Sequence, residues 1–272
     1  MSQTTRASIL RWQSNSEPSE HTDELATEEP LEIRVAGRPI SVTMRTPGHD
    51  PELAAGFLLT EGIIHQATDL RSARPLLRKE SCNVINAALA PGVAVDFARL
   101  TRHVFASSSC GLCGKTTIES VQQQFPPIHE APPIDARTLL DLPSRLADSQ
   151  EIFDRTGGLH AAAIFDVAGR LIVLREDVGR HNAVDKAIGY GVLKRLLPFD
   201  RHILMVSGRA SFEILQKALA ARIPCIAAVS APSSLAVAFA HESGQTLVGF
   251  LREKRMNVYA HPSRIHFTKP LG

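Results

Sequence analysis

The segment from residue 182 to residue 251 constrains the fold most, because helical patterns and short apolar runs alternate along it. Helices are expected at 182–197, 212–222 and 233–242, and strands at 203–207, 225–230 and 246–251. Strands that are separated by single helices and short loops pair in parallel, and the helices then cover the faces of the sheet. The pattern therefore predicts an α/β fold in which a parallel or mixed sheet is covered by helices.

A smaller α+β subdomain is predicted before this unit. Two strand patterns, 31–35 and 40–45, flank Ala36-Gly37-Arg38-Pro39, which is typical of a hairpin turn. A helix is expected to begin near Asp50 and to end near Gly62. Further strands are expected at 83–89, 93–100 and 102–106 and, after a helix at 137–155, at 161–165 and 170–174.

The chain is expected to divide into three parts. Residues 1–28 are rich in Ser, Thr and Glu and show no hydrophobic periodicity, so they are predicted to form a disordered tail. Residues 29–125 are predicted to be the α+β N-terminal subdomain, and residues 134–272 the α/β domain that binds a cofactor. The boundary is marked by four prolines that exclude regular structure, Pro126, Pro127, Pro132 and Pro133.

Composition argues against several classes of protein. The 272-residue chain has 30 Lys and Arg side chains against 28 Asp and Glu, so its overall field gives no reason to expect nucleic acid as a partner. Its four cysteines are too few for the disulfide framework of a small secreted protein. Neither a signal peptide nor a membrane-spanning run is recognisable. We expect a cytoplasmic protein that does not contact a membrane.

The segment Ser107–Lys115 places two thiols, Cys110 and Cys113, three positions apart in a glycine-flanked loop. A helix is expected directly after it, and Lys115 lies beside the cysteines. A helix N-terminus and a nearby cation both favour the thiolate over the thiol. A thiolate is the nucleophile that sulfur transfer requires, and the second cysteine could protect or resolve the product.

Three other interpretations of the cysteine pair stay open. A zinc site needs four ligands, but no second CxxC and no spaced histidine pair is present, so no metal site is predicted. A thioredoxin-like redox pair normally follows the first strand of a βαβ unit, whereas this pair follows several short strands. The cysteines could also be unreactive. Cys225, within an apolar run, and Cys82 are expected to be structural.

A second candidate site lies where the predicted parallel strands end, because open α/β sheets bind ligands at that edge. The loops 207–211 and 230–234 supply small residues and backbone donors before helices. After the last expected strand, three cations stand near an aromatic ring, which suits phosphates and a flat base. This stretch comprises Phe250, Leu251, Arg252, Glu253, Lys254 and Arg255. Each loop alone could equally be a helix cap or a solvated turn.

The turn at 176–182, Glu-Asp-Val-Gly-Arg-His-Asn, carries more polar side chains than one helix cap needs. The surplus indicates ligand or interface contacts, although capping remains an alternative. His160 precedes an apolar strand and could point into the same cleft, or it could simply be hydrogen-bonded.

Five segments together resemble one known family. They are 108–115 (SSCGLCGK), 156–162 (TGGLHAA), 176–186 (EDVGRHNAVDK), 207–209 (SGR) and 231–237 (APSSLAV). Their order and length resemble the FdhD family of formate dehydrogenase accessory sulfurtransferases, and the likeness extends over about residues 31–262. Several long motifs in the same order are far more specific than a single CxxC.

The resemblance implies a homodimeric, cytoplasmic sulfur carrier with a cytidine-deaminase-like fold. It implies that a cysteine desulfurase donates sulfur to Cys110 as a persulfide, with Cys113 as its CxxC partner. The acceptor would be molybdenum bis(molybdopterin guanine dinucleotide), held by residues 250–255, and formate dehydrogenase would then become active. A guanine nucleotide is expected to bind in place of the acceptor. Deaminase chemistry is not expected, because no H-x-E and no Pro-Cys-x-x-Cys occurs.

Two other functions remain open from the residues themselves. The chain could be a chaperone that binds the cofactor without carrying sulfur, its cysteines serving only to clamp a metal. It could also be a thiol oxidoreductase that uses the CxxC, in which case Cys113 would matter as much as Cys110. The motif spacing alone does not reveal which atom the thiol transfers.

Overall fold

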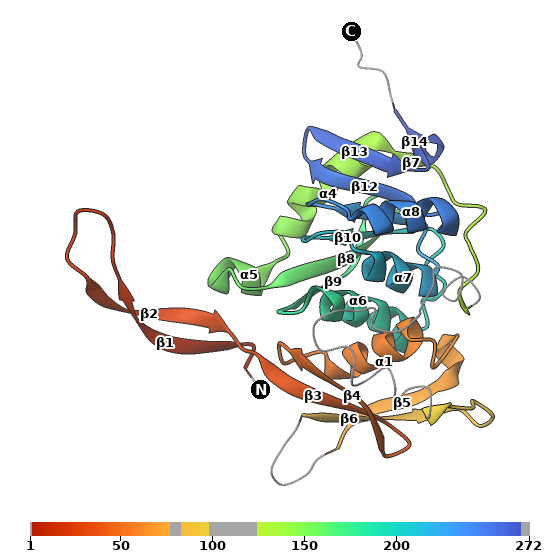
Figure 1. The fold of residues 1–272 in the computed structure, drawn as a ribbon, viewed down its shortest axis with the longest axis horizontal. Coiled ribbons are helices and arrows are strands. Elements are labelled where there is room, and N and C mark those ends of the chain that lie inside the picture. Colours follow the sequence, from red (N-terminus) through yellow and green to blue (C-terminus); the bar gives the residue numbers. More distant parts are fainter. Residues whose placement is uncertain (1, 77–82, 98–123, 268–272) are drawn as a thin grey trace.

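A mixed β-sheet forms the centre of the larger part of the molecule (Figure 1). The computed structural model describes residues 2–76, 83–97 and 124–267. Within them the sheet has six strands in the order β13-β12-β11-β10-β8-β9. Their bounds are β8 (His160–Asp166), β9 (Leu171–Asp177), β10 (His202–Val206), β11 (Cys225–Ala228), β12 (Thr246–Arg252) and β13 (Arg255–Ala260). Strands β10, β11 and β12 are parallel, as the alternation predicted, and the others pair antiparallel.

Helices cover both faces of this sheet because its strands are apolar on both sides. α6 (Arg180–Lys194), α7 (Phe212–Ala220) and α8 (Ser234–Ser243) lie on one face, and α4 (Ala136–Ala147) lies on the other (Figure 1). In β8, Ala162 and Ile164 pack with the first three helices, whereas Ala163 packs in a second cluster with Leu139 and Leu142 of α4. The predicted α/β class, a helix-covered mixed sheet with a smaller α+β N-terminal part, is confirmed.

The single helix expected at 137–155 is in fact two helices, α4 and α5 (Glu151–Thr156). The carboxyl group of Glu176 in β9 accepts hydrogen bonds from the backbone N–H groups of Ile152 at 3.0 Å and Phe153 at 2.8 Å. Donors in the first turn of a helix have no partner within that helix. A side chain from a distant strand therefore caps a new helix where periodicity alone predicts that the first one continues.

A second sheet, of four strands in the order β4-β3-β6-β5, forms the smaller part. It comprises β3 (Glu29–Val35), β4 (Arg38–Arg45), β5 (Leu70–Pro75) and β6 (Val84–Leu89), and α1 (Asp50–Thr60) packs against it. The predicted hairpin is present. Ala36 and Gly37 have φ values of 50° and 81°, as a tight turn between two twisted strands requires.

Some expected strands are absent or lie elsewhere. Residues 93–97 form no strand, because the N–H of Val93 closes a turn on the carbonyl of Ala90, and the strand expected at 102–106 lies outside the described residues. As predicted, residues 126–133 form neither helix nor strand. Four short elements lie elsewhere in the described chain: η1 (Ala67–Asp69), β7 (Ile134–Asp135), η2 (Pro262–Arg264) and β14 (Ile265–His266).

Helices α1 and α6 join the two parts at very close range. A Cβ atom built on Gly56 of α1 would lie 1.8 Å from the backbone oxygen of Asp185, and one built on Gly189 of α6 would lie 1.8 Å from that of Glu52. Real atoms cannot approach so closely, so only glycine permits this crossing. Two glycines that have no chemical role thus determine how closely the two parts pack.

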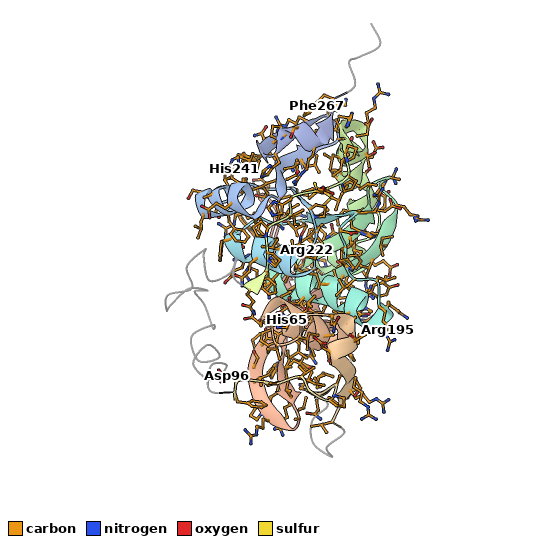
Figure 2. All side chains as sticks on the ribbon, turned by 90° about the vertical axis from the view of Figure 1, so that its right-hand side faces the viewer. His65, Asp96, Arg195, Arg222, His241 and Phe267 are labelled. Atoms are coloured by element: carbon orange, nitrogen blue, oxygen red, sulfur yellow. The ribbon has the colours of Figure 1, made fainter. Side chains whose placement is uncertain are left out.

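The two parts share one core as a result. A single buried apolar cluster includes Leu31 of the four-stranded sheet and Ile164 of the six-stranded sheet. In Figure 2, side chains fill the space between the two parts, at the height of the labelled residues His65 and Arg195. The smaller part therefore supports the larger one directly.

A buried ion pair lies at the same joint. Nζ of Lys186 in α6 lies 2.6 Å from Oδ2 of Asp177 at the end of β9, and both side chains are fully buried. Thr46, which follows β4, contacts both residues. Its N–H donates to Asp177 at 3.2 Å, and its carbonyl accepts from Lys186 at 2.8 Å. The pair therefore connects the α/β part to the smaller sheet through backbone groups.

The ion pair between Glu52 and Arg175, at the edge of the joint, predicts that the fold loses stability in acid. Burial tends to raise the pKa of Glu52, but hydrogen bonds and charge from Arg175 and His49 outweigh it and lower that pKa from 4.5 to about 2. A carboxyl group with a lowered pKa stabilises the fold above its unfolded pKa and loses that contribution as the pH falls from 4.5 towards 2. Glu52→Gln should cost about 2 kcal/mol at neutral pH and remove much of this acid-induced loss. Urea unfolding at neutral and acidic pH measures both effects.

The matched control is Asp141→Asn. Asp141 pairs with Arg145 at 3.9 Å, and both side chains are largely exposed, so this change should alter stability little at either pH. An equal acid response in wild type and Glu52→Gln would show that the contact with Arg175 does not stabilise the fold.

The N-terminal segment differs from the disordered tail predicted for residues 1–28. β1 (Thr4–Arg11) and β2 (Ser19–Ala26) form an antiparallel hairpin whose pairing runs from Thr4 and Ala26 to Arg11 and Ser19. It projects from the rest of the molecule (Figure 1), and we call residues 4–26 the arm. Composition misled the prediction because Thr and Ser, although common in disordered segments, also fit strands once their backbone groups are paired.

Candidate functional site

The loops that were predicted to converge do meet, at the edge of the six-stranded sheet where its parallel strands end. One loop follows each of β10, β11 and β12. The N–H of Ala210 donates to the carbonyl of Ala231 at 3.2 Å, and the N–H of Phe250 donates to the carbonyl of Ser230 at 3.1 Å. These backbone hydrogen bonds connect the loops of three neighbouring strands at the edge where open α/β sheets bind ligands.

A cavity of about 550 Å³ lies at this edge. Its polar lining includes His160, Ser207, Gly208 and Arg252, and α4 and α5 supply an apolar wall that includes Leu146 and Phe153. Ligand sites are typically concave, mostly apolar, and provided with a few polar groups that orient the ligand. The cavity has these properties and is large enough for part of a dinucleotide.

The stretch 250–255 lies in a hairpin, and not at a free strand end as predicted. Arg252 ends β12, Glu253 and Lys254 form the turn, and Arg255 begins β13. These four residues line a second hollow of about 420 Å³, which shares Arg252 with the first cavity. The extra strand was missed although residues 255–258 alternate between polar and apolar side chains, and their burial in the structure alternates in the same way.

The side chains of this stretch differ in their roles. Arg252 donates to the carbonyl of Val229, and Leu251 is buried in the core and supports the floor of the cavity. The ring of Phe250 is 43% exposed. Within the described ranges, none of the charged residues at 252–255 forms an ion pair. Their net positive charge is therefore available to an anion, whereas Phe250 is not among the residues that line either hollow.

His160 lies in the cavity wall at the start of β8. A Cβ atom built on Gly208 would lie 3.4 Å from its Nδ1 atom, so the two residues are neighbours. Burial, with help from the charges of Arg180 and His181, lowers the pKa of His160. A neutral imidazole at physiological pH can both donate and accept a hydrogen bond. His160 therefore lines the cavity, which is one of the two alternatives that the sequence left open.

The polar turn at 176–182 is mainly structural. Glu176 caps α5, and burial raises its pKa. Besides Lys186, Asp177 accepts from the N–H of Gly179 at 2.8 Å and from Asn182 at 3.0 Å. The capping alternative is therefore correct for Glu176 and Asp177. Their hydrogen bonds fix the backbone that borders the site.

His181 is the other prominent member of that turn. Its Nε2 atom lies 2.7 Å from Oε2 of Glu213 and 3.4 Å from Oγ of Ser211. It therefore connects the beginning of α6 to the beginning of α7, and is not among the residues that line the cavity.

The α4–α5 wall was not predicted as part of the site. Pro143 and Ala147 line both hollows, and Phe153 lines the first. The sequence placed all three residues on one long helix with no reason to face a ligand. The only signal in the sequence for an interruption of this helix was Pro143, which lies inside the expected helix at 137–155.

The cysteines fall into two groups. Cys110, Cys113 and Cys82 lie outside the described residues. Cys225 in β11 is 1% exposed, and burial raises the pKa of its thiol to about 12, which confirms its predicted packing role. Across the ranges that the structure describes, no group of three or more potential metal ligands is found, and no helix is long and apolar enough to cross a membrane.

Comparison with known proteins agrees with this architecture. Residues 26–266 match the model of the FdhD/NarQ family. The chain belongs to the FdhD/NarQ family. The sulfur carrier protein FdhD of Streptomyces coelicolor is 50% identical to it over 262 residues, which cover 93% of each chain. That of Mycolicibacterium paratuberculosis is 52% identical over 248 residues, which cover 89% of this chain and 91% of the relative.

A solved structure resembles this FdhD/NarQ family member as well. The crystal structure of a candidate formate dehydrogenase accessory protein from Desulfotalea psychrophila superposes with a TM-score of 0.76 at 25% identity, and covers 97% of this chain and 100% of that one. The resemblance predicted from the five sequence segments is therefore confirmed.

Proposed function

We propose that this FdhD-family protein is a cytoplasmic sulfur carrier that acts as a homodimer. A cysteine desulfurase is its sulfur donor, and Cys110 holds the sulfur as a persulfide. Molybdenum bis(molybdopterin guanine dinucleotide) is its acceptor substrate, which formate dehydrogenase then uses. The observation that carries the proposal is the family match, because it spans residues 26–266 and so includes Cys110 and Cys113. The matched relatives are named sulfur carrier proteins.

The thiol chemistry supports Cys110 as the carrier. Cys225 is excluded, since a buried thiol with a pKa of about 12 is neither ionised nor accessible to a donor protein. Cys110, in contrast, is followed directly by Gly111 in a loop that also contains Gly114 and Lys115. These neighbours favour an accessible thiolate.

The cavity and the 250–255 hairpin support a dinucleotide acceptor. Phosphates favour the cations of Arg252, Lys254 and Arg255, and a guanine ring favours a flat apolar partner such as Phe250. Ser207 and Gly208 line the same cavity as Arg252 and add polar and backbone groups. Neutral His160 can hydrogen-bond an uncharged part of the ligand.

Loading is a displacement at sulfur. The Cys110 thiolate attacks the terminal sulfur of the donor's persulfide, a new S–S bond forms, and the donor cysteine leaves as a thiolate. Delivery needs two electrons, which the Cys113 thiolate supplies by attacking the inner sulfur of the Cys110 persulfide. The terminal sulfur then leaves as hydrosulfide for the metal. A Cys110–Cys113 disulfide remains, and a cellular dithiol reduces it.

Mass spectrometry tests the carrier step. Purified protein incubated with a cysteine desulfurase and cysteine should gain the mass of one sulfur atom on the peptide that contains Cys110, and a dithiol should remove it. Extra mass on another cysteine, or on none, would contradict the proposal.

Arg252→Ala tests the acceptor site separately. Because Arg252 lines both hollows, its loss should weaken the binding of guanosine diphosphate about 10- to 100-fold while sulfur loading stays at the wild-type level. Isothermal titration calorimetry measures the affinity. Arg201→Ala is the matched control, because Arg201 is exposed before the start of β10, at the opposite edge of the sheet. Equal affinities for all three proteins would rule out Arg252 as a nucleotide contact.

A further inference from the structure

Gln150 is a buried residue whose side-chain amide has no hydrogen-bond partner among the residues that the structure describes. The residue is only 7% exposed. Both of its backbone groups are paired, because its N–H donates to the carbonyl of Ala147 at 3.1 Å and its carbonyl accepts from the N–H of Asp154 at 3.0 Å. Most buried side-chain polar groups in proteins are hydrogen-bonded. An amide that its own chain leaves unpaired in this way is available to a ligand.

This amide belongs to the wall of the 550 Å³ cavity, since Gln150 is one of the residues that line it. Gln150 stands directly before the first residue of α5, where a polar side chain commonly caps a helix. It does not cap α5, because Glu176 already accepts from the N–H groups of Ile152 and Phe153. The cap supplied by a distant strand thus leaves the amide of Gln150 for the cavity.

The surroundings of the amide favour an uncharged, flat group. Leu146 and the ring of Phe153 line the same cavity, and aromatic rings pack well against flat heterocycles. Of the residues in this lining, Arg252 alone carries a fixed charge, and it also lines the second hollow together with Lys254 and Arg255. A heterocycle therefore fits the first cavity, while the phosphates attached to it fit the second.

A carboxamide has a hydrogen-bond acceptor, its carbonyl oxygen, beside a donor, its NH₂ group. It can form two hydrogen bonds with a ring edge on which an N–H group stands beside a carbonyl group. Guanine has this edge at N1 and O6, and a pterin has it at N3 and O4. Both rings occur in the acceptor of the proposed function. In an apolar wall such bonds are stronger than in water, and an unpaired partner is more costly.

We infer that the side-chain amide of Gln150 recognises this N–H and carbonyl edge of the acceptor. Its carbonyl oxygen accepts from the ring N–H, and its NH₂ group donates to the ring carbonyl. Gln150 is thereby a residue that determines specificity for the heterocycle, whereas Arg252 binds phosphate. The inference rests on the acceptor site of the proposed function and is independent of the sulfur chemistry of Cys110.

Isothermal titration calorimetry of wild type and Gln150→Leu tests the inference with ligands that differ at this edge. The variant should bind guanosine diphosphate and inosine diphosphate about 10- to 100-fold more weakly, because both ligands keep the edge. 1-Methylguanosine diphosphate lacks the ring N–H, so wild type should bind it weakly, and the substitution should change its affinity less than about twofold. Inorganic pyrophosphate has no ring and should bind both proteins equally.

The matched control is Gln216→Leu, the same change on α7, which lies on the other face of the sheet from α4 (Figure 1). It should leave every affinity unchanged. A pterin ligand, 6-carboxypterin, identifies which ring Gln150 contacts. A loss of affinity in Gln150→Leu for the guanine and inosine ligands places the guanine there, whereas a loss for 6-carboxypterin in their stead places the pterin there.

Two results would overturn the inference. One is an equal loss for guanosine diphosphate and its 1-methyl derivative, and the other is no loss for either guanosine diphosphate or 6-carboxypterin. If Arg252→Ala still weakens guanosine diphosphate and pyrophosphate in those cases, the acceptor site of the proposed function stands without Gln150. A wild-type protein that binds none of these ligands would overturn the acceptor site as well.

Discussion

Cys110→Ser should leave the protein folded but unable to accept sulfur, and activation of formate dehydrogenase should fall to the level found without the protein. A serine hydroxyl ionises far above physiological pH and does not attack a persulfide, so no persulfide intermediate can form. The loss is expected to be complete because Cys225 is buried and protonated, and Cys113 alone would lack the second thiolate that the proposed delivery step requires. Mass spectrometry of the loaded protein and a formate dehydrogenase assay in cells measure the two effects.

The remaining cysteines provide the controls. Cys225→Ala should load sulfur normally, because that thiol is buried and protonated. Cys113→Ser should accept sulfur on Cys110 but deliver it poorly. Full support of formate dehydrogenase by Cys110→Ser, together with loss in Arg252→Ala, would instead identify a cofactor-binding chaperone. Reduction of disulfide substrates that depends equally on Cys113 would identify a thiol oxidoreductase.

Lys186→Met should destabilise the fold by about 3–5 kcal/mol. The Lys186 Nζ atom lies 2.6 Å from Asp177, and neither side chain reaches solvent. Removing the cation leaves a buried carboxylate whose charge is no longer compensated, which costs far more than the pair contributes net. The contact of Lys186 with the carbonyl of Thr46 is lost as well. Urea unfolding of wild type and variant measures the difference in the free energy of unfolding.

Two variants make this result specific. Adding Asp177→Asn to Lys186→Met should recover part of the loss, because the buried charge is then removed. Arg170→Met breaks an ion pair with Asp166 in which the arginine side chain is 78% exposed, and should cost less than about 1 kcal/mol. A loss for Lys186→Met as small as that for Arg170→Met would show that the pair does not hold the joint.

The buried ion pair between Lys186 and Asp177 changes the interpretation of the polar residues in segment 176–186. From the sequence, its many polar residues indicated ligand or interface contacts, with capping as the alternative. In the structure Glu176 caps a helix, and Asp177 and Lys186 join the two parts of the molecule. The cavity lies at the edge of the sheet that they hold in place. Variants in this segment should therefore impair function by destabilising that edge before they affect any chemistry.

The position of the site was predictable to a useful degree. Loops that follow neighbouring parallel strands must meet at one edge, so the convergence of the loops around Ser207, Ser230 and Arg252 followed from the strand pattern. The wall formed by α4 and α5 did not follow, because it depends on Glu176 capping a second helix at Ile152. The β12–β13 hairpin was missed for a different reason, because the alternation of residues 255–258 was a local signal that the strand prediction overlooked.

The sequence by itself determined the α/β class, the alternation of helices and parallel strands along the chain, and the family, because periodicity, apolar runs and long motifs are local properties of a chain. The tertiary structure alone decided which polar residues line the cavity and which hold the fold together. The role of a carboxylate depends on the donors within about 3 Å of it, and Asp177 finds one of its donors at Thr46, 131 residues away. No local pattern contains that information.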